Sequence, residues 1–256
     1  YALIGRNRRL SNEELSEKTK GRKGIGKLAT LFLSKKYYYF IIFATNLLIM
    51  TKKQRADFVR KELDKLYPTV PIFLHHTDAY TLLVAVALSA QTTDKKVNEI
   101  TPELFRVAGT PQAMARLEVA EIKDLIKEIG LSNTKAKNLK GMAEMLLKDY
   151  EGVVPQTFEE LEKLPGVGHK TASVVMSQWF GFPAFPVDTH IHRLMKLWKL
   201  TEGKNVTQTE ADAKKLFPQK DWNKLHLQII SYGREYSPAR NWSLEKDFIT
   251  RQMFEK

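Results

Sequence analysis

Two side chains that could carry covalent chemistry lie close to a turn that could bind a phosphate. The segment Leu164-Pro165-Gly166-Val167-Gly168-His169-Lys170 ends on a primary amine, and Pro186-Val187-Asp188 supplies a carboxylate further along the chain. A primary amine can act as a nucleophile, and a carboxylate can stabilise positive charge or move protons. Beside a phosphate site, these two groups indicate chemistry on a nucleic acid.

The turn itself predicts a helix-hairpin-helix. Residues from Glu159 to Leu164 have the pattern of a short helix, and helical spacing resumes from Lys170 to Phe180. Between them, Pro165 and two glycines form a turn that bulky residues could not follow. The second helix would present unpaired N–H groups and the positive end of its dipole to an anion. We therefore expect the backbone to bind a DNA phosphate here.

Each of these features also has a simpler explanation. Pro-Gly-x-Gly is a common turn, Lys170 could be a solvated surface lysine, and Asp188 could cap the helix that follows it. The combination favours a site, because Lys170 lies two residues past the hairpin, where a bound phosphate would hold it against the duplex. The proline-stiffened segment before Asp188 could return its carboxylate to the same helix end.

Three further segments match a known family when they are read together with the hairpin. They are Leu82–Asp94 (LLVAVALSAQTTD), Ile129–Ala136 (IGLSNTKA) and Val187-Asp188-Thr189-His190. With them the chain resembles the endonuclease III family of DNA glycosylases, in the superfamily defined by a helix-hairpin-helix, a Gly/Pro-rich loop and an aspartate. The resemblance runs from about residue 51 to about residue 240.

The resemblance implies a role for individual residues. Lys170 would be the nucleophile and Asp188 the catalytic carboxylate, while Gln91 and Leu131 would fill the gap left by an extruded nucleotide. Without the resemblance, Gln91 is explained as a polar helix end and Leu131 as part of a helix stop at Gly130. Further DNA contacts are implied for Pro165, Gly166, Val167, Gly168, His169, Thr171 and His190.

The implied activity is that of a base-excision-repair enzyme with two functions. It would remove oxidised pyrimidines from duplex DNA and cleave the strand 3′ to the abasic site by β-elimination. The resemblance also implies a cytoplasmic monomer that acts on the nucleoid and not on a membrane.

Two alternative functions stay open. An enzyme that removes mispaired adenine usually lacks the hairpin lysine, so Lys170 argues against it. A non-catalytic helix-hairpin-helix module has no need for Asp188 or for the segment around Gln91.

The chain contains no cysteine. Disulfides and cysteine-ligated clusters are therefore excluded. Many members of the resembled family carry four cysteines near the C-terminus that hold a [4Fe–4S] cluster, whereas this region reads SYGREYSPAR from Ser231 to Arg240. We expect a variant without cofactor and without a metal site, since no histidine pair has the spacing of a metal-binding helix face. The resemblance allows a loosely bound cation at the hairpin carbonyls.

Apolar residues make up 43% of the 256 residues, enough for a substantial core. Helical spacing recurs from Lys52 onward and no run alternates as strands do, so we predict an all-α fold. The resemblance implies a six-helix barrel at 72–182, and a second helical lobe formed by 51–71 together with 183–256. Residues 1–49 are set apart as an extension with no assigned function. They carry ten of the Lys and Arg residues against three Glu, and so contribute more than half of the net charge of +12.

Overall fold

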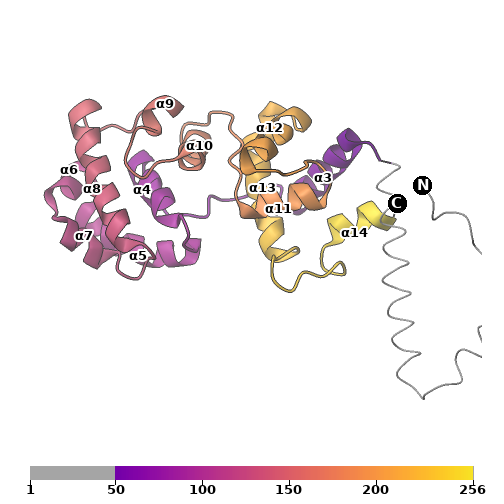
Figure 1. Ribbon diagram of the computed structural model, residues 1–256, viewed down its shortest axis with the longest axis horizontal. Coiled ribbons are helices and arrows are strands. Elements are labelled where there is room, and N and C mark those ends of the chain that lie inside the picture. Colours follow the sequence, from indigo (N-terminus) through magenta and orange to yellow (C-terminus); the bar gives the residue numbers. More distant parts are fainter. Residues whose placement is uncertain (1–49, 256) are drawn as a thin grey trace, which may run out of the picture. The chain divides into compact units, whose positions relative to one another are not determined.

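The computed structural model describes residues 50–255 (Figure 1), and the extension 1–49 lies outside the described residues. The hairpin, the predicted site residues and the helices that support them belong to one compact unit, Met50–Arg251. All regular secondary structure in the described residues is helical, which confirms the predicted fold class. The helices are α3 Lys52–Leu66, α4 Ala79–Ser89, α5 Asp94–Ala108, α6 Pro111–Arg116, α7 Val119–Leu125, α8 Ser132–Asp149, α9 Phe158–Leu161, α10 His169–Gln178, α11 Thr189–Leu197, α12 Val206–Leu216, the 3₁₀ turn Gln219–Asp221, α13 Trp222–Glu235 and α14 Phe248–Glu255.

The helix α4 forms the centre of a first group of helices, α4 to α10. Nearly every one of its residues is buried, as expected for a helix that is apolar on all sides. It packs against α5, α8 and α10, and its side chains join an apolar core that extends from Leu74 to Met176. The C-terminal end of α4 therefore reaches the surface on a rigid support, directly before Gln91.

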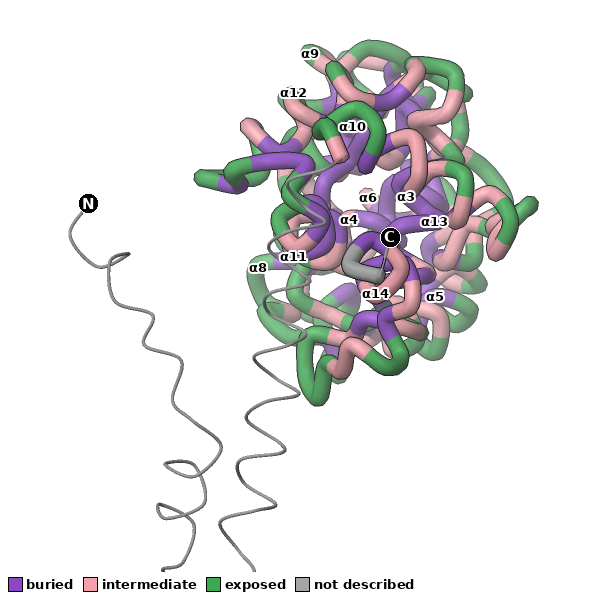
Figure 2. Tube along the Cα trace, turned by 90° about the vertical axis from the view of Figure 1, so that its right-hand side faces the viewer, coloured by how far each residue is buried: buried purple, intermediate pink, exposed green. Residues whose placement is uncertain are grey.

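The helix α13 has the same role in a second group, formed by α3 and by α11 to α13. It packs against α3 and α11, and its residues from Leu225 to Ile230 are buried (Figure 2). Trp198 and Tyr232 are the largest fully buried side chains and lie with their rings 5.9 Å apart. This second core anchors α11, which begins directly after Asp188.

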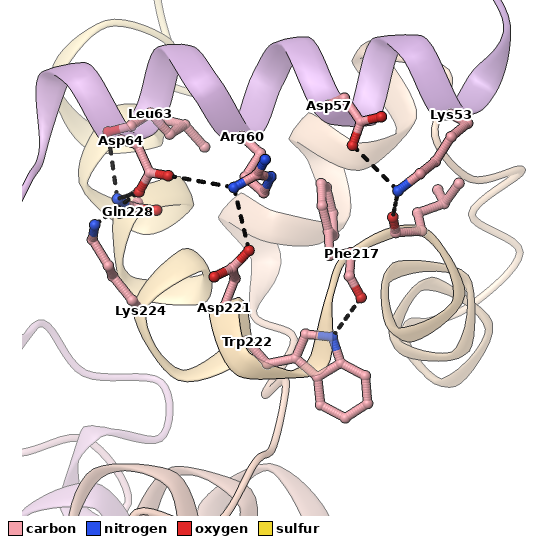
Figure 3. A network of polar contacts seen from close by, with 11 residues as sticks. Lys53, Asp57, Arg60, Leu63, Asp64, Phe217, Asp221, Trp222, Lys224 and Gln228 are labelled. Atoms are coloured by element: carbon pink, nitrogen blue, oxygen red, sulfur yellow. Dashed lines mark hydrogen bonds and ion pairs between the residues drawn. The ribbon is translucent and has the colours of Figure 1, made fainter.

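Polar contacts attach α3 to α13 although the two are far apart in sequence (Figure 3). The Gln228 amide donates to the Tyr67 carbonyl at 2.8 Å, and Lys224 Nζ lies 2.8 Å from Asp64 Oδ1. Lys53 Nζ donates to the Leu216 carbonyl at 2.8 Å. These contacts place the start of the described chain among its last helices.

In the sequence, a hydroxyl followed by acidic residues predicts helix starts at Thr101-Pro102-Glu103 and at Thr209-Glu210-Ala211-Asp212. Both predictions are wrong. Thr101-Pro102-Glu103 does not begin a helix, because α5 runs through Pro102; the buried stripe of Val97, Ile100 and Leu104 holds the helix together across the missing N–H donor. Thr209 is also inside a helix, α12, which is capped by Asn205.

Candidate active site

The hairpin joins α9 to α10 through a turn that its neighbours fix. Gly166 has φ +79°, a conformation that disfavours side chains, and a Cβ there would lie 2.9 Å from the Asn138 amide nitrogen. Pro165 packs over Gly141, where an added Cβ would lie 3.4 Å from the proline ring. Val167 is buried beneath the turn. Packing within the protein therefore accounts for the residue types at Pro165, Gly166 and Val167.

Packing within the protein does not account for the glycine at Gly168. It is the N-cap of α10 with φ −98°, no side chain caps the first N–H groups of that helix, and a Cβ at Gly168 would meet no atom within 4 Å. The fold therefore has space for a side chain at this position. Its absence leaves room for an anion to approach the backbone N–H groups.

Lys170 lies in the first turn of α10 and is exposed. Its ammonium group has no hydrogen bond or ion pair to any residue in the described part of the chain. It lines a cavity of about 730 Å³ together with Asp188, Gln91 and His190. Residues from three separate segments of the sequence thus share one cavity, which also borders on Asp94 and Arg234.

Asp188 is the N-cap of α11, and its Oδ1 accepts a hydrogen bond from the Ile191 N–H at 2.8 Å. The simpler interpretation of Asp188 as a helix cap is therefore correct. Capping the helix is not the only role open to Asp188, because the same half-buried carboxylate lines the cavity beside Lys170. The cap bond fixes the carboxylate, and its other oxygen, Oδ2, makes no hydrogen bond within the described residues.

The two residues predicted to fill the DNA gap share an unusual backbone conformation. Gln91 has φ +56° and Leu131 has φ +61°, both in the left-handed region that non-glycine residues rarely adopt. Leu131 is the N-cap of α8 and is 61% exposed, the behaviour of an apolar side chain that projects into solvent. Gln91 lines the cavity with Lys170, whereas Leu131 does not.

Of His169, Thr171 and His190, only His190 lines this cavity. The His169 ring lies 2.8 Å from Glu162 Oε1 and 3.2 Å from Glu210 Oε2, so it joins the hairpin to α12. Burial lowers the pKa of His169, but the two carboxylates outweigh burial and raise it above its ordinary value. Burial lowers the pKa of His190, and Thr171 is half-buried. The His169 side chain is thus committed to carboxylates of the protein.

A polar network below the cavity was not anticipated from the sequence. Gln178 Nε2 lies 3.2 Å from His226 Nε2, and the Asn223 amide donates to the Ser177 carbonyl at 3.1 Å. Burial lowers the pKa of His226 to about 4, so its ring is neutral at pH 7. Nδ1–H then donates to the Trp222 carbonyl, and Nε2 accepts from Gln178. Gln178 and His226 line a smaller cavity, about 70 Å³, with Lys170 and Asp188. No local pattern in the sequence predicts these partners.

Fold, hairpin and cavity together define a helix-hairpin-helix protein of the base-excision-repair class. Residues 84–219 match the HhH-GPD superfamily of base excision DNA repair proteins. Endonuclease III of Synechocystis sp. is 42% identical over 191 residues, which cover 74% of this chain and 87% of the relative. The chain belongs to the endonuclease III family of the HhH-GPD superfamily.

Two solved structures agree with this assignment. A trapped endonuclease III–DNA covalent intermediate aligns with a TM-score of 0.74 and 37% identity, over 77% of this chain and 92% of that chain. A non-covalent endonuclease III–DNA complex aligns with a TM-score of 0.76 and 34% identity, over 81% and 100%. None of the described helices is both long and apolar enough to cross a membrane.

The chain has no cysteine, so it offers no ligands for the [4Fe–4S] cluster of the resembled family. The described residues also contain no group of three or more His, Asp or Glu that could hold a metal ion. The C-terminal segment is attached in another way, by the buried carboxylate of Asp247. It accepts from the Tyr232 hydroxyl at 2.6 Å, from the Trp242 indole at 2.7 Å and from the Thr250 N–H at 3.2 Å. The residues present thus do not fit the cluster.

Proposed function

We propose that this protein is a DNA glycosylase and AP lyase that removes oxidised pyrimidines from duplex DNA and then cuts the strand 3′ to the abasic site. The observation that carries the proposal is the cavity that Lys170 and Asp188 share at the N-terminus of α10. An amine, a carboxylate and an open phosphate-binding turn meet there in a chain of the endonuclease III family.

Lys170 is the proposed nucleophile. An ammonium group has no lone pair, so it must first release a proton; Asp188 lines the same cavity and can accept it, directly or through water. The amine then attacks C1′ of the sugar. The bond from Nζ to C1′ forms, the bond from C1′ to the base breaks, and the base leaves with the electron pair and a proton.

The second step uses the same amine. Opening of the sugar ring yields a Schiff base between Lys170 and C1′, which makes the hydrogens on C2′ acidic. Loss of a C2′ proton forms a double bond between C2′ and C3′, and the bond from C3′ to the phosphate oxygen breaks. Asp188 acts in both steps by stabilising positive charge at the sugar and by moving protons.

Gln91 and Leu131 are the proposed gap-filling residues. Extrusion of a nucleotide costs a few kcal/mol in lost stacking and pairing. An amide at Gln91 can replace hydrogen bonds to the base left behind, and the exposed Leu131 side chain can occupy the stack. Pro165, Gly166, Val167, Gly168, His169, Thr171 and His190 form the proposed DNA contact surface, where His169 contributes its backbone because its ring is paired with carboxylates.

No cofactor is assigned to the proposed reaction, and no step depends on one. A loosely bound cation at the hairpin carbonyls is compatible with the proposal, as a screen between the backbone and a DNA phosphate. Activity on mispaired adenine, or DNA binding without catalysis, is the alternative outcome of the experiment that follows.

Borohydride reduction tests the nucleophile. We expect it to trap a covalent adduct between the protein and duplex DNA that contains an oxidised pyrimidine or an abasic site, and we expect Lys170→Gln to abolish that adduct. The matched control is Lys95→Gln, because Lys95 is a second amine that lines the same cavity. Undiminished trapping by Lys170→Gln would show that another amine is the nucleophile.

A panel of duplexes, each with a single lesion, tests the substrate class. Base release and strand cleavage are scored separately for each duplex. We expect both products from oxidised pyrimidines. Release of mispaired adenine without strand cleavage would contradict the proposal, and so would DNA binding without any product.

A further inference from the structure

Lys135 is a buried lysine that has no carboxylate partner among the described residues. It lies in the first half of α8 and is only 8% exposed. Its ammonium group donates three hydrogen bonds: to the Leu88 carbonyl at 2.9 Å, the Ala90 carbonyl at 2.7 Å and the Thr92 hydroxyl at 3.0 Å. All three ammonium hydrogens are thereby used.

The three acceptors enclose Gln91. Leu88 lies near the end of α4, and Ala90 and Thr92 stand on either side of Gln91 in the turn that follows. At its backbone, Lys135 N–H donates to the Leu131 carbonyl at 3.0 Å. One residue is therefore bonded both to the turn that presents Gln91 and to the turn that presents Leu131.

Both turns hold a non-glycine residue in the left-handed region. Such a conformation is unfavourable for a residue with a side chain and persists only where the surroundings impose it. No side chain caps the N-terminus of α8 at Leu131. The contacts of Lys135 supply a constraint common to both turns.

Packing alone does not explain a charged group in this place. Burial disfavours an ammonium ion, and it lowers the pKa of Lys135. A methionine of similar length could fill the space without that cost, but it could not hold three oxygens in one arrangement. The role of the buried ammonium group is thus to hold the backbone and hydroxyl oxygens on both sides of Gln91 in place.

We propose that Lys135 is a positioning residue that holds the Gln91 turn and the Leu131 turn as one rigid unit, so that both side chains enter the duplex together when the nucleotide is extruded. This inference rests on the proposed function, since it takes Gln91 and Leu131 as the gap-filling residues. Lys135 itself touches neither the substrate nor the reacting atoms.

Lys135→Met tests the proposal with two substrates. A duplex with an oxidised pyrimidine requires extrusion and gap filling, whereas a single strand with an abasic site requires only Schiff-base chemistry at Lys170. We expect the excision rate on the duplex to fall by ~10- to 100-fold, as for a misplaced positioning group. Borohydride trapping on the single strand should stay close to the wild-type rate.

A fluorescent signal gives a second readout. With 2-aminopurine opposite the lesion, wild-type binding should change the fluorescence as the stack is opened and refilled, and Lys135→Met should lose that change. The matched control is Lys137→Met, which removes an exposed lysine of the same helix and should match wild type in both assays. Equal losses on both substrates by folded Lys135→Met, or no loss on the duplex, would overturn the proposal.

Thr92→Val decides the question if Lys135→Met does not fold. It removes one of the three acceptors, keeps the shape of the side chain and leaves Lys135 in place. A loss confined to the duplex substrate supports the proposal, and an equal or absent effect overturns it. Failure of the proposed function would look different, since wild type would then trap neither substrate.

Discussion

At the scale of single residues, Asp188 has two roles that one substitution can separate. Its Oδ1 caps α11, and its carboxylate lines the cavity with Lys170. Asparagine is as good an N-cap as aspartate but carries no charge. Asp188→Asn therefore removes the charge and retains the cap.

We expect Asp188→Asn to slow single-turnover base excision by ~10²- to 10³-fold, a typical loss for a preorganised charged group at a transition state. DNA affinity and the unfolding free energy should change little. Asp78→Asn is the matched control, because Asp78 caps α4 in the same manner outside the cavity. If Asp188→Asn were less stable than wild type but excised the base at the same rate, Asp188 would act only as a helix cap.

At the scale of elements, the C-terminal segment shows how a buried network holds a region that contains no cysteine to bind a metal cluster. Asp247 accepts hydrogen bonds from Tyr232, Trp242 and Thr250, and the Tyr232 hydroxyl in turn accepts from the Ile249 N–H at 2.9 Å. Tyr232 and Asp247 are fully buried. Loss of the carboxylate would leave several donors without acceptors in the interior.

We expect Asp247→Ala to lower the unfolding free energy by roughly 2 to 5 kcal/mol, because hydrogen bonds to a buried charged group are lost and their donors are left unpaired. Urea denaturation followed by circular dichroism measures the change. Glu245→Ala, at an exposed position of the same segment, should have little effect. If the two variants were equally stable, the Asp247 network would not be what holds the segment.

At the scale of the whole molecule, we propose that residues 1–49 are an extension that catalysis does not require. The hairpin, both cavities and both helix groups lie within the compact unit Met50–Arg251. The extension carries ten Lys and Arg against three Glu, whereas the rest of the chain has a net charge of only +5. Its contribution to DNA binding would be electrostatic and independent of DNA sequence.

We expect a variant that begins at Met50 to retain its helical content and its lyase activity on abasic DNA. It should bind undamaged DNA more weakly, and its affinity should depend less steeply on salt, because fewer cations neutralise phosphates. The 256-residue chain measured across the same salt series is the control. An inactive or insoluble variant would show that the extension belongs to the fold.

Local patterns in the sequence were sufficient for the hairpin and for the fold class. Proline and glycine at Pro165 and Gly166 predict a tight turn, and the helical spacing around it predicts the helices, because both depend on neighbouring residues. The same locality explains the wrong helix starts at Thr101 and Thr209, where burial outweighed the capping pattern. The assignment of Gln91 and Leu131 depended on family resemblance.

Only the tertiary structure decided which side chains meet. Lys135 and the Leu88 carbonyl are 47 positions apart, and Gln178 and His226 are 48 apart, so no local pattern links them. The neutral state of His226 likewise follows from burial between two helices. The sequence by itself determined the turn, the nucleophile candidate and the all-α class, since these depend on local conformation and residue type. The cavity, the Lys135 contacts and the Asp247 network depend on long-range packing, which brings distant donors and acceptors within bonding distance.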